Sequence, residues 1–352
     1  MNYDNEIDNP ATTADLILQE TLNREGTHNR ERAVHRRGFL EICAGAGAIV
    51  GETLLAAKAF ATNSPFEIID CHTHFYDPGR SQGVPWPSKD SSLYRKVMPQ
   101  DLKELPKYRP ITGTVIVEAS EWIEDNQWLL DLAKDDPFVV GIVGRLDPAA
   151  PVFVEQVRRF AKNPLYRGIR VWEDRVRGLL DRGELGSFRE MAELGIAADL
   201  NGSPEVVPLA SKLASLVPSL TIVLNHIGNV AVTKAPPPES WINAIRGAAN
   251  HQNVYCKISA LAEGASRDGN KAPAELDFYR PTIDVVWGAF GDDRVIYGSN
   301  WPVSELATDY RTVQKIALDY AFEKGEATAQ KFCAGNAAKA YRWVNRPGRV
   351  PV

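Results

Sequence analysis

The sequence predicts one α/β domain folded as a (β/α)8 TIM barrel and preceded by an export leader, and three features favour this fold. Eight short apolar runs rich in β-branched residues follow one another after residue 63. Amphipathic helical patterns separate most of them, and eight such units in about 280 residues match the usual size of a TIM barrel. Polar residues also gather at the C-terminal ends of seven runs, where the active site of such a barrel lies.

The eight runs are almost continuously apolar, which is typical of parallel strands buried on both faces. They cover residues 66–70, 114–118, 138–143, 168–172, 196–200, 220–224, 253–258 and 294–298. Helical periodicity is clearest at residues 126–134, 152–161, 205–216 and 281–290. We therefore expect a single barrel over residues 65–343 and a C-terminal tail over residues 344–352, with no second domain.

Composition excludes several classes of partner. The 352-residue chain carries a formal net charge of −5 and has no basic stripe with interleaved aromatic residues, so nucleic acid is not an expected partner. No uninterrupted apolar run is long enough for a transmembrane helix, so no stable membrane anchor is expected after removal of a signal. The four cysteines form no Cys-x-x-Cys pair, which favours buried free thiols over a disulfide framework.

The first sixty residues have the pattern of an export signal. Residues 1–34 are polar and are expected to be disordered. Residues 35–61 contain Arg36 and Arg37, then a weakly apolar segment, then a small-residue Ala-x-Ala site ending at Ala61, as in a twin-arginine signal. The prediction is export to the periplasm; the alternative is a basic-capped helix on a cytoplasmic barrel. Undisturbed export after both arginines are changed to lysine would contradict it.

The polar residues at the strand ends are the candidate site. Residues just beyond the C-terminal ends of barrel strands face the active-site mouth, whichever strand they follow. His72 and His74 alternate along the first run, so both imidazoles can converge on one ligand or metal. The full candidate set is His72, His74, Glu118, Arg170, His226, Lys257 and Asn300.

Several motifs resemble the amidohydrolase-2 branch of the amidohydrolase superfamily, in the right order along the chain. They are the His-Thr-His of residues 72–74, the Asn-His-Ile-Gly of residues 225–228, the Gly-Ser-Asn-Trp-Pro of residues 298–302, and the matching segments 166–170, 255–259 and 331–337. Within that branch the chain is most similar to the sugar-lactone hydrolases, a group with fuconolactonase, rhamnonolactonase and pyrone-dicarboxylate lactonase members.

The resemblance implies a hydrolase that opens a sugar or sugar-acid lactone by attack of water on the carbonyl, with a small molecule as its partner. Whether the protein forms a homo-oligomer is left open. Two other functions also stay open: a nonoxidative decarboxylase of the same branch, and a non-catalytic carbohydrate-binding barrel. Release of carbon dioxide from an aromatic acid would favour the first, and ligand binding without turnover the second.

Two departures from the branch bear on the chemistry. The fifth strand offers Asp199 instead of a histidine and the fourth offers Arg170 instead of a lysine, so a binuclear metal site is disfavoured. Asn300 stands where many relatives have aspartate, and an amide cannot act as a base. His72, His74 and His226 could bind one divalent metal, zinc or manganese, or could instead donate hydrogen bonds to the carbonyl oxygen.

The remaining candidates each have two interpretations. Glu118 is a spare carboxylate for base or ligand, or a salt-bridge partner of Arg170 or Lys257. Arg170 suits a substrate carboxylate or a pair of hydroxyls, or an ion pair with Asp199. Lys257 could donate to the oxyanion, or pair with Asp199 or Glu118. If a metal is bound, Asn300→Asp should be tolerated, because aspartate could add a ligand or a base.

Overall fold

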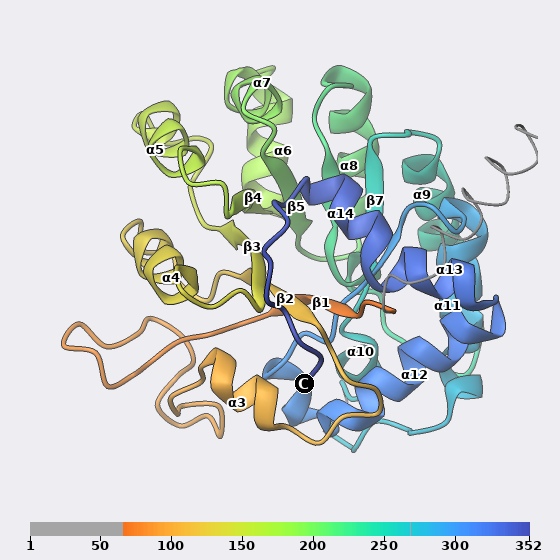
Figure 1. The fold of residues 1–352 in the computed structure, drawn as a ribbon. Helices are drawn as coiled ribbons and strands as arrows, with labels where there is room; N and C mark the ends of the chain where they lie inside the picture. The colour runs from red at the N-terminus through yellow and green to blue at the C-terminus, as the bar shows by residue number, and fades with distance from the viewer. Residues whose placement is uncertain (1–65, 268) are drawn as a thin grey trace, which may run out of the picture. The chain divides into compact units, whose positions relative to one another are not determined.

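A computed structural model describes residues 66–267 and 269–352, and these form eight parallel strands joined in chain order and surrounded by helices (Figure 1). The strands are β1 (Ile69–Thr73), β2 (Gly113–Val117), β3 (Val139–Gly144), β4 (Tyr166–Trp172), β5 (Ala197–Asn201), β6 (Ile222–Leu224), β7 (Val254–Ile258) and β8 (Val295–Tyr297). Each one overlaps a run predicted from its apolar character, because strands buried on both faces have no polar side to interrupt the run.

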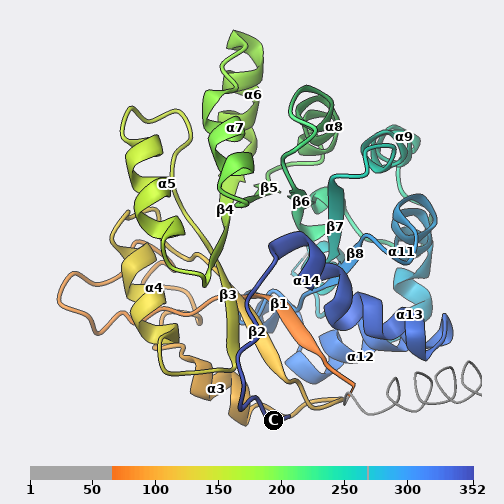
Figure 2. The ribbon, with the colours of Figure 1, turned by 45° about the horizontal axis from the view of Figure 1, so that its top comes forward.

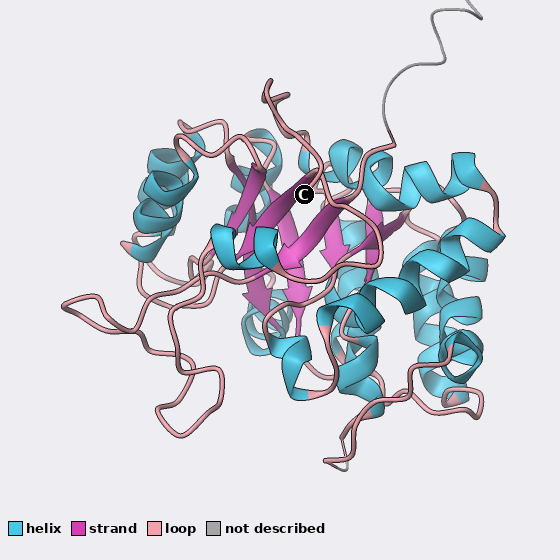
Figure 3. Cartoon of the chain, turned by 60° about the horizontal axis from the view of Figure 1, so that its bottom comes forward, coloured by secondary structure: helices cyan, strands magenta, loops and turns pink. Residues whose placement is uncertain are grey.

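The sheet closes on itself where β1 meets the segment that follows β8. Thr73 forms a parallel bridge with Trp301. The amide of Asn300 donates to the carbonyl of His72 at 2.8 Å, and the amide of His74 donates to the carbonyl of Trp301 at 2.8 Å. Within the described residues, the strands therefore form a nearly closed barrel with helices outside (Figure 3), which confirms the predicted barrel.

The longer helices on the outside are α4 (Asp125–Ala133), α5 (Phe153–Ala161), α6 (Glu173–Arg182), α7 (Gly186–Glu193), α8 (Val206–Leu216), α9 (Glu239–Ala249), α11 (Leu276–Phe290) and α12 (Tyr310–Glu323). Shorter ones are α3 (Pro99–Glu104), α10 (Leu261–Ala265), α13 (Glu326–Gln330) and α14 (Asn336–Tyr341). The sequence predicted that α11 would begin at Pro281, but it begins five residues earlier. Burial of Tyr279 on the same apolar face as Ile283 stabilises the additional turn.

The core has two layers. One lies between the strands and the helices, and the other fills the barrel itself with Ile69, Val115, Val223 and Ile296. Tyr341 of α14 packs against this inner layer, and α14 crosses the barrel at the end where these strands begin (Figure 2). That end is thus plugged, and the opposite end, where the strands finish, stays available for the site.

The C-terminal tail packs against the barrel. Ile111 and Val352 exchange backbone hydrogen bonds of 3.1 and 2.9 Å, and the guanidinium of Arg346 donates to the carbonyls of residues 133, 136 and 139. The predicted leader, residues 1–34 and 35–61, lies outside the described residues. Among the residues described, no helix has both the length and the apolar character needed to span a membrane.

Candidate active site

Three imidazoles meet at the open end of the barrel. The ring centroids of His72 and His226 are 4.3 Å apart, and those of His72 and His74 are 5.0 Å apart. Ile69 and Cys71 of β1 face the barrel interior, so strict alternation would point His72 away from it. The pairing of β1 with β2 is irregular between Asp70 and Thr73, and an irregularity of this kind re-aims side chains.

The turn that carries His226 has an unusual backbone. Residues 226–229 have φ values of 55°, 50°, 69° and 51°, all left-handed, and only one of the four is glycine. Left-handed backbone costs roughly 1–2 kcal/mol for each non-glycine residue, so it persists only where neighbours hold it. Trp241 of α9 donates from Nε1 to the carbonyl of Ile227 at 3.1 Å. Such held strain is typical of functional sites.

Hydrogen bonds orient two of the three rings. Nδ1 of His74 lies 3.0 Å from the carbonyl oxygens of both Val117 and Glu118. Because a carbonyl only accepts, Nδ1 carries the proton and Nε2 keeps its lone pair. Nδ1 of His226 pairs with Oγ of Ser259 at 2.9 Å. Neither nitrogen of His72 has a partner within the described residues.

The imidazoles are electrically neutral at ordinary pH. Burial and then the positive charge of Arg170 lower the pKa of His74 to about 4. Burial lowers the pKa of His72 and of His226 well below the usual value, and the nearby positive charges of Arg170 and Lys257 act in the same direction. Neutral imidazoles with an orienting partner on one nitrogen are the form in which histidine binds metals.

The donor chemistry therefore suits a cation, and both ring nitrogens of the buried His72 are left for one. The positions of the rings do not form a ready-made cluster: among residues 66–267 and 269–352, no three His, Cys, Asp or Glu side chains are placed to hold a metal ion.

Glu118 lies between two arginines at the mouth. Its Oε1 is 3.6 Å from Nη1 of Arg145 and 3.9 Å from Nη1 of Arg170, and its Oε2 accepts from the amide of Ser120 at 2.9 Å. Burial raises the pKa of the Glu118 carboxyl, and the two arginines oppose that shift. Nη2 of Arg170 is 3.5 Å from Nε2 of His226. Arg170 thus pairs with Glu118, and the alternative pair with Asp199 is not formed.

Lys257 lies deeper, inside the barrel. Its Nζ is 2.7 Å from Oδ2 of Asp199, and both side chains are completely buried. The hydroxyl of Tyr341 donates to the same carboxylate, at 3.0 and 2.8 Å from its two oxygens. The structure therefore shows Lys257 in the ion pair with Asp199, and the positive charge of Lys257 contributes to lowering the pKa of His72 and His226.

The segment after β8 brings Asn300 to the imidazoles. Asn300 has a φ of 63° and is 6% exposed. Its Oδ1 is 3.2 Å from Nε2 of His74, and its Nδ2 donates to Oε1 of Glu263 at 2.7 Å. A side chain on Gly298 would place its Cβ 2.8 Å from that of His72, so glycine is needed for this close approach.

Asp70 ties the segment after β8 to β1. Its Oδ1 accepts from the amides of Ser299 at 2.9 Å and His72 at 3.2 Å, and its Oδ2 accepts from the hydroxyl of Tyr310 at 3.0 Å. One buried carboxylate therefore sets the spacing between the two segments that carry His72 and Asn300.

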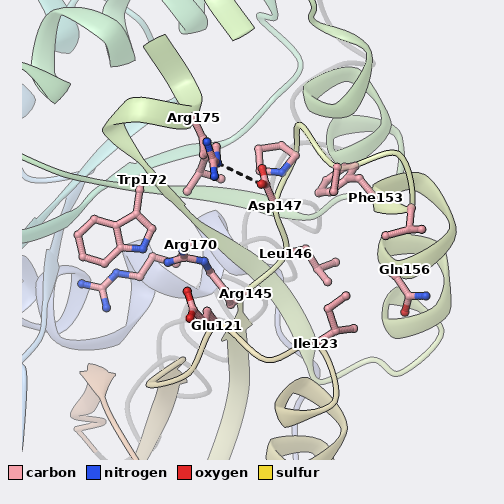
Figure 4. A pocket seen from close by; sticks show the side chains of 14 residues that line it. Glu121, Ile123, Arg145, Leu146, Asp147, Phe153, Gln156, Arg170, Trp172 and Arg175 are labelled. Carbon is pink, nitrogen blue, oxygen red and sulfur yellow. Dashed lines mark ion pairs between the residues drawn. The ribbon is translucent and has the colours of Figure 1, made fainter. Parts of the chain in front are cut away.

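A pocket of about 260 Å³ adjoins this cluster, among residues that follow β2 and β3 and residues at the end of β4 (Figure 4). Arg170 belongs both to its wall and to the imidazole cluster. Trp172 is 37% exposed, and the guanidinium carbons of Arg145 and Arg170 lie 5.5 and 5.1 Å from its ring centroid. Trp301 is completely buried, so its role is packing.

The structure thus brings six of the seven predicted residues to the mouth and leaves Lys257 in the interior. It also adds Arg145, Ser259 and Glu263, which the sequence did not single out. Ser259 follows directly on the seventh apolar run and had the same positional signal as the others. Glu263 lies farther along, in α10, where no motif marks it.

The barrel with histidines at its open end defines a class of hydrolase, and comparison with known proteins agrees with that class. The amidohydrolase family model matches residues 69–343, and the chain belongs to this family. It is 30% identical over 246 residues to L-fucono-1,5-lactonase of Burkholderia ambifaria, which covers 68% of this chain and 81% of that protein. It is 25% identical over 255 residues to a 2-pyrone-4,6-dicarboxylate hydrolase of Comamonas testosteroni, covering 69% and 79%.

Solved structures show the same fold. An amidohydrolase from Burkholderia multivorans, with bound zinc, superimposes with a TM-score of 0.71 at 24% identity, covering 79% of this chain and all of that one. The superfamily is metal-dependent, and the zinc in that structure belongs to the relative.

Proposed function

We propose that this protein hydrolyses a sugar or sugar-acid lactone by attack of water on the ring carbonyl. The observation that carries the proposal is the cluster of three neutral imidazoles that shares Arg170 with a pocket lined by an exposed tryptophan. The similarity to lactone hydrolases supports the reaction class.

The reaction needs a water that loses a proton, a stabilised oxyanion and a proton for the departing alkoxide. Glu118 is a buried carboxylate beside Arg170, and it could accept the proton of water. Arg170 lies between the pocket and His226 and can stabilise negative charge on the carbonyl oxygen. A divalent cation, zinc or manganese, held by His72, His74 and His226 would supply Lewis-acid chemistry there.

The pocket favours a polar ring as substrate. Trp172 lines the pocket and is 37% exposed. The guanidinium groups of Arg145 and Arg170 lie over its ring and provide forked donors for ring hydroxyls or a carboxylate. Burial of Arg170 leaves its Nε without a partner among the described residues, which keeps one donor for a ligand.

A panel of lactones tests the proposal. Purified protein, with its metal content measured, is assayed with a pH indicator on five- and six-membered sugar lactones and on uronic-acid lactones, and with an aromatic acid for release of carbon dioxide. We expect acid release from at least one sugar-derived lactone. Carbon dioxide release without lactone opening would favour a decarboxylase, and lactone binding without turnover would favour a carbohydrate-binding barrel; either result contradicts the proposal.

A further inference from the structure

Glu263 places a carboxyl group behind Asn300. It belongs to α10, which follows β7, and its Oε1 accepts the hydrogen bond from Nδ2 of Asn300 at 2.7 Å. Its other oxygen, Oε2, is buried and has no partner within the described residues. Those residues show no ion pair of Glu263 with an arginine or lysine, so the hydrogen bond to Asn300 is the polar contact that the carboxyl makes with another side chain.

This contact decides which way the amide of Asn300 faces. Burial raises the pKa of the Glu263 carboxyl to about 7. Above that pH the carboxylate can only accept, so the NH2 group of Asn300 faces Glu263 and Oδ1 faces Nε2 of His74. Nε2 of His74 carries a lone pair, because its Nδ1 donates to backbone carbonyls. Two lone pairs therefore face each other across 3.2 Å. That arrangement is satisfied only by a donor or cation placed beside both atoms.

A rotated amide would have the opposite effect. With NH2 toward His74, Asn300 would donate to Nε2 and occupy its lone pair, while Oδ1 would meet the carboxylate of Glu263 and be repelled. The ionised carboxylate thus disfavours the orientation that closes His74 to ligands.

We propose that Glu263 is a positioning residue that holds Oδ1 of Asn300 toward His74. Without Glu263, the amide of Asn300 could rotate and turn this acceptor oxygen away from the site. The inference rests on the proposed lactone hydrolysis for its kinetic readout. Glu263 acts through Asn300 and touches no reacting atom. Above a pH of about 7 the negative charge lies on Glu263, and Asn300 brings an uncharged oxygen to the imidazoles.

Exchanging the two side chains tests the inference. In Asn300→Asp, two carboxylates would lie at hydrogen-bond distance and could not both stay ionised. In the double variant Glu263→Gln/Asn300→Asp, the introduced glutamine donates from its amide and the introduced aspartate again turns an oxygen toward His74. We expect kcat to fall about tenfold in Glu263→Met and in Asn300→Asp, the value of roughly one hydrogen bond. Adding Glu263→Gln to Asn300→Asp should raise kcat.

The sign of that last change separates positioning from a merely structural role. A structural Glu263 would make Glu263→Gln equally harmful in both backgrounds, and that result, or full kcat in Glu263→Met, overturns the inference. Thermal unfolding of each variant shows that the protein is folded.

A second readout does not depend on turnover. In protein with 15N-labelled histidine, the Nε2 resonance of His74 should move in the direction of an accepted hydrogen bond in Glu263→Met, where the amide is free to rotate. An unmoved resonance overturns the inference. If the wild-type protein opens no lactone, the proposed function fails, and this measurement still tests the orientation of Asn300.

Discussion

Replacing His226 with alanine should lower kcat/KM for the lactone substrate on the order of 100-fold or more, the effect of losing several kcal/mol of transition-state stabilisation. His226 is held by a left-handed turn and by Ser259, and its Nε2 faces Arg170. Removing the ring takes away one of the three imidazoles and leaves Arg170 with Glu118 alone. Steady-state kinetics on the lactone identified in the panel measures the loss.

His251 provides the matched control. It lies outside the mouth, where its Nε2 pairs with Oγ of Ser211 at 3.0 Å between α8 and the end of α9. His251→Ala should keep kcat/KM within about twofold of wild type, since surface changes of this kind have small effects. If His226→Ala retains most of its activity while remaining folded, the imidazole cluster is not the reaction centre.

The positions of the strands could be predicted because the strands are buried on both faces and most of their residues are apolar. The runs at 114–118 and 253–258 coincide with β2 and β7 to within one residue at each end. The first run was placed three residues too early, at 66–70, because β1 continues through Asp70, His72 and Thr73. Polar residues in a fully buried strand carry no apolar signal, and these are the residues that lead into the site.

The site could be predicted as a place but not as a set of contacts. The sequence shows which residues follow each predicted strand, and this placement located His72, His226 and Asn300. The ion-pair partner of each charged side chain depends on how deep in the barrel that side chain lies. Lys257 and Glu118 both come from strand ends, yet one pairs with Asp199 in the interior and the other with Arg145 at the mouth. The spacing of residues in the sequence does not predict this difference in depth.

Glu263 shows a second limit of prediction from the sequence. It lies in a short helix of the loop after β7 and reaches Asn300 across 37 residues of sequence. The sequence-based expectation that Asn300→Asp would be tolerated left this neighbour out. With Glu263 at hydrogen-bond distance from Asn300, the added carboxylate would lie beside one already there, and we therefore expect Asn300→Asp to lower kcat.

Removal of divalent metal should abolish turnover, and zinc or manganese should restore it. His72, His74 and His226 are kept neutral by burial, which is the protonation state that a cation requires. Asn300 cannot accept a proton, so a metal-free site lacks the base that an aspartate would supply there. Dialysis against a chelator, followed by assay before and after metal is added back, measures the effect. Thermal unfolding of the dialysed protein shows whether the barrel has survived.

Glu118→Gln separates this route from the metal-free one. If chelation leaves full activity, we expect Glu118 to take the proton from water, and Glu118→Gln should abolish turnover with substrate binding nearly intact. Glutamine keeps the size of the side chain and an oxygen for Arg145 and Arg170, so loss of kcat without a rise in KM reports the lost base. If activity survives both chelation and Glu118→Gln, neither route operates, and the water must be activated by a group outside the imidazoles and Glu118.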